Sequence, residues 1–300
     1  MGARIEVVGL TKSYGDLRAV DDLTFTIEPG EFFGLLGPNG AGKTTALEMI
    51  EGLRKPDAGS VSIDGHDPWR RDPRLQRRIG VQLQSSAFFE RLTAREQLVT
   101  FASLYDAPAE RADALLAEVG LEDKADSRVE KLSGGQAQRL SIACALVHDP
   151  EIVFLDEPSS ALDPQARRNL WDFLQGLSGS GRTVVLTTHY MEEAEVLCDR
   201  VAIIDHGRLL ELDSPAALVR GLDAPTRITL APEAIDEGAA REVGGVDEVT
   251  VYPDRIELST RRPAEVLAEL ARRDALHGLS ASGASLEDVF LQLTGREYRS

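Results

Sequence analysis

A nine-residue segment, Gly37 to Thr45, has the composition of a phosphate-binding loop. It spells GPNGAGKTT, follows the apolar run FFGLLG and precedes the helical run TTALEMIEGL. Glycines at positions 37, 40 and 42 allow backbone angles that other residues resist, so successive N–H groups can point at phosphate oxygens. A helix that begins near Lys43 directs the positive end of its dipole at the same anion. Because a strand, a loop and a helix occur in this order, the pattern indicates a phosphate site rather than a glycine-rich turn without a ligand.

The side chains of this segment have separate expected roles. Lys43 can reach the β- and γ-phosphates of a nucleotide, the Thr44 hydroxyl can bind Mg²⁺, and Thr45 lies one step further on, near the α-phosphate. We therefore expect ATP and Mg²⁺ as cofactors. The residues of the segment that we expect to contact the nucleotide are Gly37, Pro38, Asn39, Gly40, Ala41, Gly42, Lys43, Thr44 and Thr45.

Two adjacent carboxylates, Asp156 and Glu157, follow the apolar run IVFL. In open α/β sheets, ligands collect at the carboxyl ends of strands. There Asp156 can hold a metal ion through water, and Glu157 can orient or deprotonate an attacking water. Adjacent carboxylates at a dry strand end are costly unless a cation or a proton compensates them. Alone, the pair fits a solvated loop equally well; the phosphate loop upstream favours a catalytic pair.

Short β-rich runs alternate with helical stretches up to about residue 220. The runs IVFLD and TVVLTT are almost entirely apolar, which is typical of strands covered on both faces in a parallel α/β sheet. Helices are predicted over residues 92–104, 108–119, 135–147 and 164–177.

The composition changes after about Leu218. The segment RGLDAPTR has no periodic pattern and is expected to be a linker. The later runs RITL, VTVY and RIEL predict strands, PAEVLAELARR predicts a helix, and Ser285 is a candidate cap for a last helix. The predicted domains are therefore residues 1–220, with a helical subdomain at about 85–150, and a small α+β domain over residues 221–300.

The 300-residue chain carries 50 acidic and 33 basic residues, a net charge of −17. This charge opposes surface binding to nucleic acid and direct adsorption to anionic lipid. The two cysteines, Cys144 and Cys198, are too few for a disulfide framework or a zinc cage and are expected to be buried thiols. The N-terminus lacks the layout of a secretion signal, and no run is long enough to cross a bilayer, so we expect a cytosolic chain.

Five further segments carry a resemblance to a known family. They are LTKSYG with Tyr14, IGVQLQ with Gln84, LSGGQ at 132–136, SSALD at 159–163, and TTHY with His189. Together with GPNGAGKTT and FLDEP, in this order, they resemble the ATP-binding subunits of ABC transporters over residues 4 to about 220. LSGGQ paired with a phosphate loop is highly specific. The resemblance implies a P-loop NTPase cassette of the α/β class, with a mixed or parallel sheet and a helical subdomain, that couples ATP hydrolysis to transmembrane transport.

The resemblance also gives individual residues a role. Tyr14 corresponds to the aromatic residue that stacks on adenine, although an ordinary core or surface tyrosine fits too. Gln84 corresponds to the residue that contacts Mg²⁺ and the attacking water; Gln82, on the same strand face, competes with it, and the family form IGxxxQ favours Gln84. The expected catalytic residues are Glu157, His189 and Gln84, with His189 on the γ-phosphate, and the expected metal-binding residues are Thr44, Gln84 and Asp156.

The segment LSGGQAQRL offers a second anion-binding element at the start of a helix, where a hydroxyl and N–H groups can bind an anion. The resemblance implies that this anion is the γ-phosphate held by another subunit, so that two chains meet head to tail around two ATP molecules. An ordinary helix cap at Ser133 uses the same groups and is compatible with this role. Asp163 corresponds to an inter-subunit coupling residue and equally fits the N-cap of a helix that starts at Pro164. The signature residues expected to contact nucleotide are Ser133, Gly134, Gly135 and Gln136.

The expected partners are a second ATP-binding subunit, as a homodimer because both half-sites are intact, and an integral membrane permease. The surface after Gln84 would present Phe88, Phe89 and Leu92 to a permease helix; alternatively, these side chains cover the core. The chain would then be cytoplasmic and peripheral on the inner face of the membrane. The tail GASLEDVFLQLTGRE resembles that of ATP-binding subunits of daunorubicin/doxorubicin-type exporters. It implies efflux of a drug-like or lipophilic cargo, with a lipid, polysaccharide or ion as the alternative.

Two other functions compete with transport. Soluble ABC ATPases that act on DNA or ribosomes usually carry two cassettes, zinc clusters or a long coiled-coil insertion, and this acidic chain has none of these. The basic cluster RRDPRLQRR, Arg70 to Arg78, is the contrary signal, but a solvated face explains it more simply, so no nucleic-acid partner is expected. A module that senses ATP without hydrolysing it is disfavoured by the complete set of Glu157, Gln84 and His189.

Overall fold

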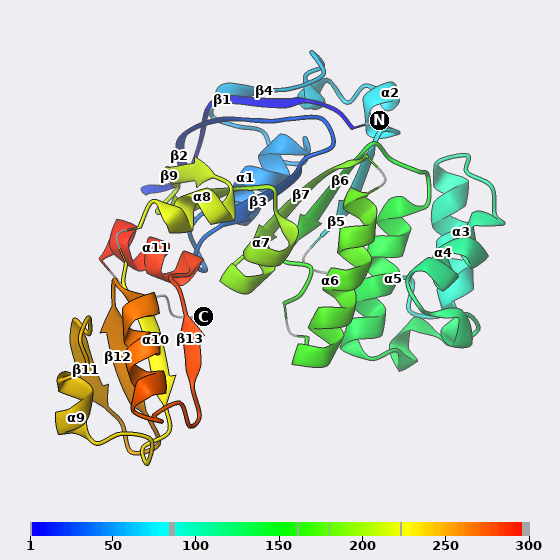
Figure 1. Cartoon of the computed structure of the whole chain (residues 1–300). Helices are drawn as coiled ribbons and strands as arrows, with labels where there is room; N and C mark the ends of the chain where they lie inside the picture. Colours follow the sequence, from blue (N-terminus) through cyan, green and yellow to red (C-terminus); the bar gives the residue numbers. More distant parts are fainter. Residues whose placement is uncertain (1, 84–87, 161, 180, 223, 296–300) are drawn as a thin grey trace. The chain divides into compact units, whose positions relative to one another are not determined.

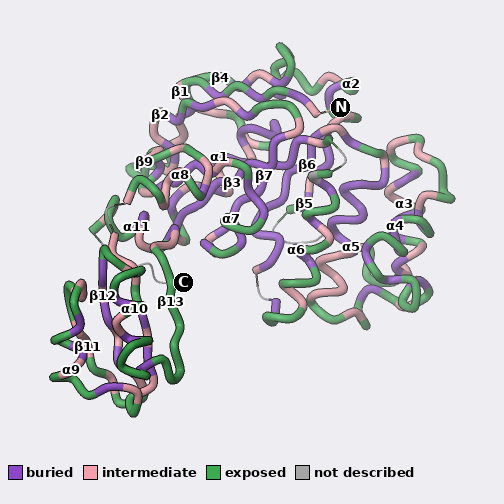
Figure 2. The backbone as a smooth tube through the Cα atoms, viewed as in Figure 1, coloured by how far each residue is buried: buried purple, intermediate pink, exposed green. Residues whose placement is uncertain are grey.

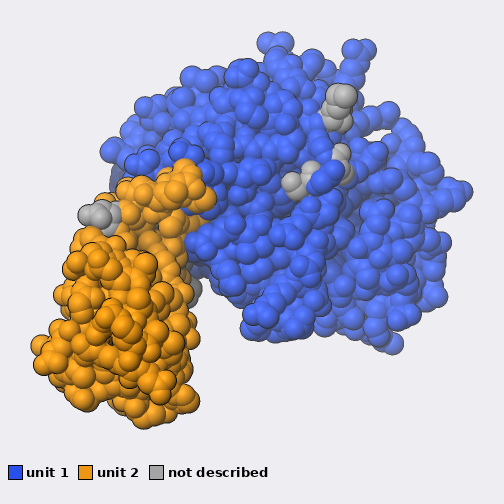
Figure 3. Space-filling view, viewed as in Figure 1, with its two compact units in different colours: residues 1–215, 298–300 blue, residues 216–297 orange. Residues whose placement is uncertain are grey.

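The computed structural model describes residues 2–83, 88–160, 162–179, 181–222 and 224–295. The chain divides into two compact units, Met1–Pro215 and Ala216–Glu297, which Figure 3 shows in blue and orange. Among the described residues, no helix has both the length and the apolar character needed to span a bilayer.

Unit 1 is built on a six-stranded sheet with the strand order β5-β6-β7-β3-β8-β9 (Figure 1). Its strands run parallel except β9, which pairs with β8 in the antiparallel direction. Every residue of β3, β6 and β7 is buried, which confirms the prediction of strands covered on both faces. The six strands are β3 (Phe32–Leu36), β5 (Ile79–Gln82), β6 (Ile152–Asp156), β7 (Thr183–Thr188), β8 (Arg200–Asp205) and β9 (Arg208–Asp213).

A second, antiparallel sheet of unit 1 has the order β2-β1-β4. Its strands are β1 (Ile5–Tyr14), β2 (Leu17–Ile27) and β4 (Ala58–Ile63). Side chains alternate between core and solvent at the start of β1, where Ile5 and Val7 are buried. Phe25 of β2 stacks on Phe33 of β3 with ring centroids 5.3 Å apart, so aromatic packing joins this sheet to the larger one.

The helices predicted from the sequence are present with shifted ends. In Figure 1, α3 to α6 lie together in green and cyan, and α3, α4 and α5 pack on one another. Both cysteines are buried free thiols, as predicted. The helices up to the linker are α1 (Lys43–Ile50), α2 (Pro73–Gln76), α3 (Ala94–Leu104), α4 (Arg111–Glu118), α5 (Gly134–Leu146), α6 (Pro164–Ser178), α7 (Met191–Leu197) and α8 (Pro215–Arg220).

Unit 2 carries a four-stranded antiparallel sheet with the order β11-β12-β10-β13. The predicted pair of VTVY and RIEL is confirmed as β11 with β12. The chain order β10-α9-β11-β12-α10-β13 with this sheet order is the split β-α-β arrangement, which the sequence alone did not indicate. Its elements are β10 (Thr226–Leu230), α9 (Glu237–Arg241), β11 (Glu248–Val251), β12 (Ile256–Thr260), α10 (Pro263–Arg272), β13 (Ser280–Ser282) and α11 (Leu286–Thr294).

The core of unit 2 lies between its sheet and α10. Ile228 of β10 and Leu258 of β12 are neighbours across the two strands, and both are fully buried. Val266 and Leu270, one turn apart on α10, are also fully buried. Figure 2 shows these strands in purple along their buried positions. The unit therefore has a hydrophobic core of its own.

We predict that Leu258→Ala destabilises unit 2. Removing a fully buried leucine leaves a cavity and lowers the free energy of unfolding by about 2–5 kcal/mol. Hydrogen exchange in peptides that span residues 226–282 measures this loss locally. Val251→Ala, at a half-exposed position on β11, is the matched control. Equal exchange in both variants would contradict the assigned core.

Candidate functional site

The loop between β3 and α1 takes backbone angles that glycine adopts readily. Gly40 and Gly42 have φ angles of 81° and 99°, in the left-handed region. The expectation that Gly37 also needs an unusual angle is wrong, because its φ lies outside that region. A Cβ at Gly37 would instead lie 2.1 Å from the Ile204 carbonyl oxygen. Close backbone approach therefore requires glycine there.

Lys43 is buried at the first position of α1. Its Nζ donates to the carbonyl oxygens of Gly37 and Pro38, at 2.9 and 3.1 Å, and lies 3.4 Å from Glu157 Oε1. Burial lowers the pKa of Lys43, and the carboxylates of Glu157 and Asp156 oppose that effect. The side chain thus curls over its own loop with its charge facing the strand end.

Asp156 is held by two hydroxyl groups. Thr44 Oγ1 and Thr187 Oγ1 both donate to Asp156 Oδ1, at 3.0 and 2.5 Å. Burial raises the pKa of Asp156, and these two hydrogen bonds oppose the rise. The contact brings the predicted metal-binding residues Thr44 and Asp156 together across 112 positions of sequence.

Glu157 has an unusual backbone conformation. Its φ is 47°, in the left-handed region that non-glycine residues rarely adopt. Its N–H donates to the carbonyl and hydroxyl oxygens of Thr187, at 3.1 and 2.9 Å, which fixes this geometry. These hydrogen bonds hold the left-handed backbone at the end of β6 against β7.

The Glu157 carboxylate lies between Lys43 and His189. His189 Nδ1 is 3.3 Å from Glu157 Oε2, opposite the Lys43 contact on Oε1. The hydrogen bond with His189 lowers the pKa of Glu157, burial opposes it, and the charge of Lys43 lowers it further. The carboxyl group is therefore ionised at neutral pH, as a general base must be.

The donor atoms at this strand end fit Mg²⁺. Glu157 Oε1 lies 3.4 Å from Lys43 Nζ, and burial, together with the charges of Glu157 and Glu48, raises the pKa of Asp156. Thr44 and Asp156 offer oxygen donors, which Mg²⁺ prefers, and few enough of them for water and phosphate to complete an octahedron. Among the described residues, no group of three or more His, Cys, Asp or Glu side chains could hold a metal ion.

Lys43, Thr44 and Glu157 border a hollow of about 430 Å³. Its lining comprises Tyr14, Leu17, Ala19, Asn39, Gly40, Gly42, Lys43, Thr44, Thr45 and Glu157. The Tyr14 ring, at the end of β1, is partly exposed, and Arg54 Cζ lies 5.5 Å from its centroid. The structure thus brings the phosphate loop, Glu157 and Tyr14 to one hollow.

The described residues of the LSGGQ segment do not line this hollow. Ser133 and Gly134 are exposed at the start of α5, which lies well apart from α1 in Figure 1. Ser133 forms a capping box with Gln136: its Oγ accepts from Gln136 N at 3.3 Å, and its N donates to Gln136 Oε1 at 3.0 Å. Ser133 therefore caps α5, and the capping groups face solvent.

Asp163 caps α6. Its Oδ1 accepts from the N–H groups of Gln165 and Ala166, at 3.0 and 2.9 Å. Its carboxylate is exposed, so the capping role leaves the other oxygen available to a partner.

The predicted Mg²⁺ contact Gln84 lies outside the described residues. Its competitor Gln82 is the last residue of β5 and is buried, with Nε2 donating to the Leu83 carbonyl oxygen at 2.5 Å. Of the predicted permease contacts, Phe89 is exposed, whereas Phe88 and Leu92 are half-buried. The permease contact therefore stays a prediction, and Phe89 is the exposed member of the three.

Sequence reasoning missed Thr187. Its hydroxyl contacts both Asp156 and the backbone of Glu157, so it organises the strand end. The signal was available: two threonines end the apolar run TVVLTT, and a buried hydroxyl needs a partner.

The arginine cluster between β4 and β5 pairs with carboxylates. Arg77 pairs with Asp106, and Arg78 Nε lies 3.0 Å from Glu151 Oε1. These pairs support the prediction of a solvated face.

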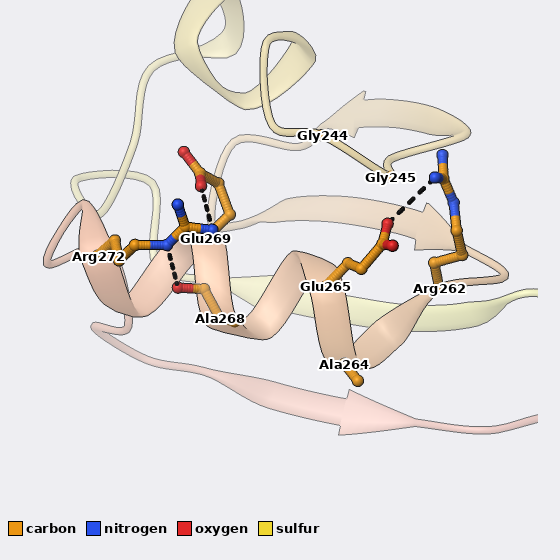
Figure 4. Close-up of a pocket in the computed structure, with 8 residues that line it drawn as sticks. All are labelled: Gly244, Gly245, Arg262, Ala264, Glu265, Ala268, Glu269 and Arg272. Carbon is orange, nitrogen blue, oxygen red and sulfur yellow. Dashed lines mark hydrogen bonds and ion pairs between the residues drawn. The ribbon is translucent and has the colours of Figure 1, made fainter.

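A larger hollow, of about 700 Å³, lies on unit 2 (Figure 4). Its charged side chains pair with one another: Arg262 Nη1 lies 3.1 Å from Glu265 Oε2, and Arg272 Nη2 lies 2.8 Å from Glu269 Oε2. This mutual compensation leaves no excess positive charge to attract phosphate.

A sequence model of the ABC transporter family matches residues 20–160 of the chain. Curated relatives match almost the whole length. The Nod factor export ATP-binding protein I of Burkholderia pseudomallei (strain K96243) is 41% identical over 306 residues, covering 98% of this chain and 98% of the relative. The protein of the same name from Sinorhizobium fredii (strain NBRC 101917 / NGR234) is 42% identical, covering 98% of this chain and 87% of the relative.

The matching solved structures cover 70–72% of this chain. An ATP-binding subunit of an ABC transporter is 31% identical with a TM-score of 0.65, covering 72% of this chain and 92% of that one. The ATP-binding cassette MJ0796, in a dimeric post-hydrolysis state bound to ADP and Pi, is 30% identical with a TM-score of 0.64, covering 70% and 98%.

These similarities confirm the predicted fold class, a P-loop ABC cassette. The relatives are named for Nod factor export, so the finer resemblance to daunorubicin-type exporters is not confirmed. The chain belongs to the ATP-binding subunits of ABC transporters, which work with membrane permeases and dimerise, and it is an ATPase of that family.

Proposed function

We propose that this chain powers an exporter as a head-to-tail homodimer that encloses two Mg²⁺-bound ATP molecules. One observation carries the proposal. The hollow that holds the phosphate loop also holds Glu157, but none of the described LSGGQ residues. Because Ser133 and Gly134 of that segment are exposed elsewhere on the same unit, a second copy can supply them.

Binding begins at the loop between β3 and α1. The N–H groups after Gly40 and the N-terminus of α1 attract the phosphates. Lys43 then exchanges its contacts with the Gly37 and Pro38 carbonyls for phosphate oxygens. Tyr14, at the rim of the same hollow, stacks on the adenine.

Thr44 and Asp156 would hold the Mg²⁺, with Gln84 from the segment after β5. When bound, the ion neutralises phosphate charge and orients the γ-phosphoryl group for in-line attack. The carboxylate pair, only partly compensated by Lys43, explains why this strand end would favour a divalent cation.

Glu157 acts as the general base toward the attacking water. Its contacts with Lys43 and His189 hold the carboxylate at the end of β6. His189 is expected to contact the γ-phosphate from the same side. The Ser133 hydroxyl and the N–H groups of Gly134 and Gly135 of the second copy close the site over that phosphate.

The exposed ring of Phe89, with the half-buried Phe88 and Leu92 beside it in sequence, is the proposed contact with the permease helix. Such a contact would place the chain at the cytoplasmic face of the cell membrane. Membership of a transporter family supports this location.

Export is supported by relatives named for Nod factor export. We propose a lipophilic or drug-like cargo from the sequence of the tail, and a Nod factor-like cargo is the alternative that the relatives favour. Transport of each cargo into inverted vesicles that contain both subunits would distinguish the two.

Lys43→Ala is expected to weaken ATP binding. The loss of charge-assisted hydrogen bonds, about 1.5–3 kcal/mol, raises the dissociation constant about 10- to 100-fold. Titration with a fluorescent ATP analogue measures this, and Lys55→Ala, at an exposed position, is the control. Unchanged affinity would remove Lys43 from the site.

Glu157→Gln is expected to bind ATP and dimerise but hardly turn over. Removing a positioned general base lowers the rate about 10²–10⁴-fold. Phosphate release gives the rate, and size-exclusion chromatography with ATP gives the oligomeric state. The exposed substitution Glu118→Gln should change neither. Wild-type turnover in Glu157→Gln would assign the base elsewhere.

A further inference from the structure

Two cations contact the Tyr14 ring, and the proposed reaction uses neither of them. Lys12, two positions earlier on β1, has its Nζ 5.9 Å from the ring centroid, and Arg54 Cζ lies 5.5 Å from it. Both distances are within the range of a cation–π interaction, in which a positive charge is attracted to an aromatic ring. Tyr14 is 42% exposed, so packing covers the ring only in part. The two cations can therefore hold a ring that the core does not.

A carboxylate from outside β1 fixes the Lys12 ammonium group. Lys12 Nζ donates to Asp57 Oδ1 at 2.7 Å, and Ser13 N donates to Asp57 Oδ2 at 2.8 Å. Asp57 N in turn donates to the Thr11 carbonyl oxygen at 2.9 Å. The hydrogen bonds with Lys12 and Ser13 lower the pKa of Asp57, so its carboxylate is charged at neutral pH. Lys12 thus contacts the ring from a fixed position.

Arg54 is fixed by the end of α1. The N–H groups of Leu53 and Arg54 both donate to the Glu48 carbonyl oxygen at 2.9 Å, and the Arg54 guanidinium pairs with the Glu48 carboxylate. Gly52, with a φ of 83°, ends the helix in a Schellman motif. The helix that begins with Lys43 of the phosphate loop therefore holds Arg54 at its other end.

The Tyr14 ring borders the hollow of unit 1, and the two cations do not. Tyr14 is one of the residues that line the hollow, whereas Lys12 and Arg54, both in the described part of the chain, are not among them. The cations therefore contact the ring from outside the hollow. The side of the ring toward the hollow is left for a nucleobase.

We propose that Lys12 and Arg54 are positioning residues for the nucleobase, which hold the Tyr14 ring at the rim of the hollow in the orientation that stacks on adenine. The proposal rests on the proposed role of Tyr14 and adds two residues that contact neither phosphate nor metal. A ring that is already fixed loses less conformational freedom when the base binds, so stacking becomes more favourable. Because Arg54 is anchored to α1, one helix holds both the ring and the phosphate-binding N-terminus.

Two ligands separate the effect on the base from the effect on the phosphates. ATP with Mg²⁺ carries the adenine, whereas inorganic tripolyphosphate with Mg²⁺ offers only phosphates to the loop. Lys12→Ala/Arg54→Ala should lower ATP affinity about 4- to 25-fold, since each cation–π contact at an exposed site contributes about two- to fivefold. Isothermal titration calorimetry should find tripolyphosphate affinity unchanged, which also shows that the variant is folded.

A double-mutant cycle with Tyr14 tests whether the cations act through the ring. Tyr14→Ala should itself weaken ATP binding about 5- to 100-fold, as expected for the loss of a base-stacking contact. In that background, Lys12→Ala/Arg54→Ala should cause no further loss, because the cations have no ring to hold. The exchanged pair Lys12→Arg/Arg54→Lys keeps both positive charges and should keep ATP affinity within about twofold of wild type.

Turnover gives a further readout, and unit 2 supplies the matched control. Lys12→Ala/Arg54→Ala should raise KM for ATP and leave kcat within about twofold, because the base takes no part in the chemical step. Arg255 Cζ lies 4.1 Å from the Tyr252 ring centroid in unit 2, so Arg255→Ala also removes a cation from an aromatic ring. That variant should leave ATP affinity and KM unchanged.

The outcomes distinguish the two proposals. If the wild-type chain binds neither ATP nor tripolyphosphate, the proposed function fails. If Tyr14→Ala weakens ATP binding and Lys12→Ala/Arg54→Ala does not, only the positioning role fails. An equal loss for both ligands, or a loss that persists without the Tyr14 ring, would mean that the cations act on the phosphates and would contradict positioning. Tighter ATP binding in Lys12→Ala/Arg54→Ala would place the cations on the stacking face and overturn it as well.

Discussion

The end of β6 holds two adjacent, buried carboxylates, whose negative charge is offset by one lysine. The need to stabilise this buried charge explains most of the contacts in the site. Asp156 relies on the hydroxyls of Thr44 and Thr187, and Glu157 relies on Lys43 and His189. Each contact lowers the unfavourable energy of a buried negative charge, but none neutralises it fully. A divalent cation would offset the remaining negative charge of the two carboxylates. The left-handed backbone at Glu157 is part of the same arrangement, held by hydrogen bonds to β7.

The helix N-termini of unit 1 serve two purposes with one set of groups. Ser133 caps the N-terminus of α5 through a capping box, and Asp163 caps the N-terminus of α6. Capping satisfies N–H groups that the helix itself cannot, and an exposed cap can also accept or approach a group from another molecule. Because the Ser133 cap does not line the hollow of its own chain, the site of one chain is incomplete with respect to its signature residues. In the proposed head-to-tail homodimer, dimerisation and catalysis are linked by this geometry.

Short sequence patterns predicted most of the candidate site and part of the fold. The phosphate loop, the carboxylate pair and the capping residues follow from short patterns, because glycine angles, strand ends and helix caps are properties of neighbouring residues. Contacts between residues that are far apart in the sequence did not follow from such patterns. The contact of Thr187 with Asp156 depends on β7 lying beside β6, and the split β-α-β order of unit 2 depends on pairing between distant strands. At Phe88 and Leu92, which are half-buried, the sequence left two roles open, contact with a permease and cover for the core.

The most direct test of the central claim mixes two inactive homodimers. Lys43→Ala disables the phosphate loop, and Ser133→Arg blocks the signature element. If each site combines the loop of one chain with the signature of the other, a mixed dimer has one intact site, and random mixing restores about a quarter of wild-type hydrolysis. A mixture of Lys43→Ala with Glu157→Gln, whose defects lie in the same half-site, should restore nothing. Recovery in the first mixture alone supports the account; no recovery, with mixed dimers demonstrated by differential tagging, contradicts it.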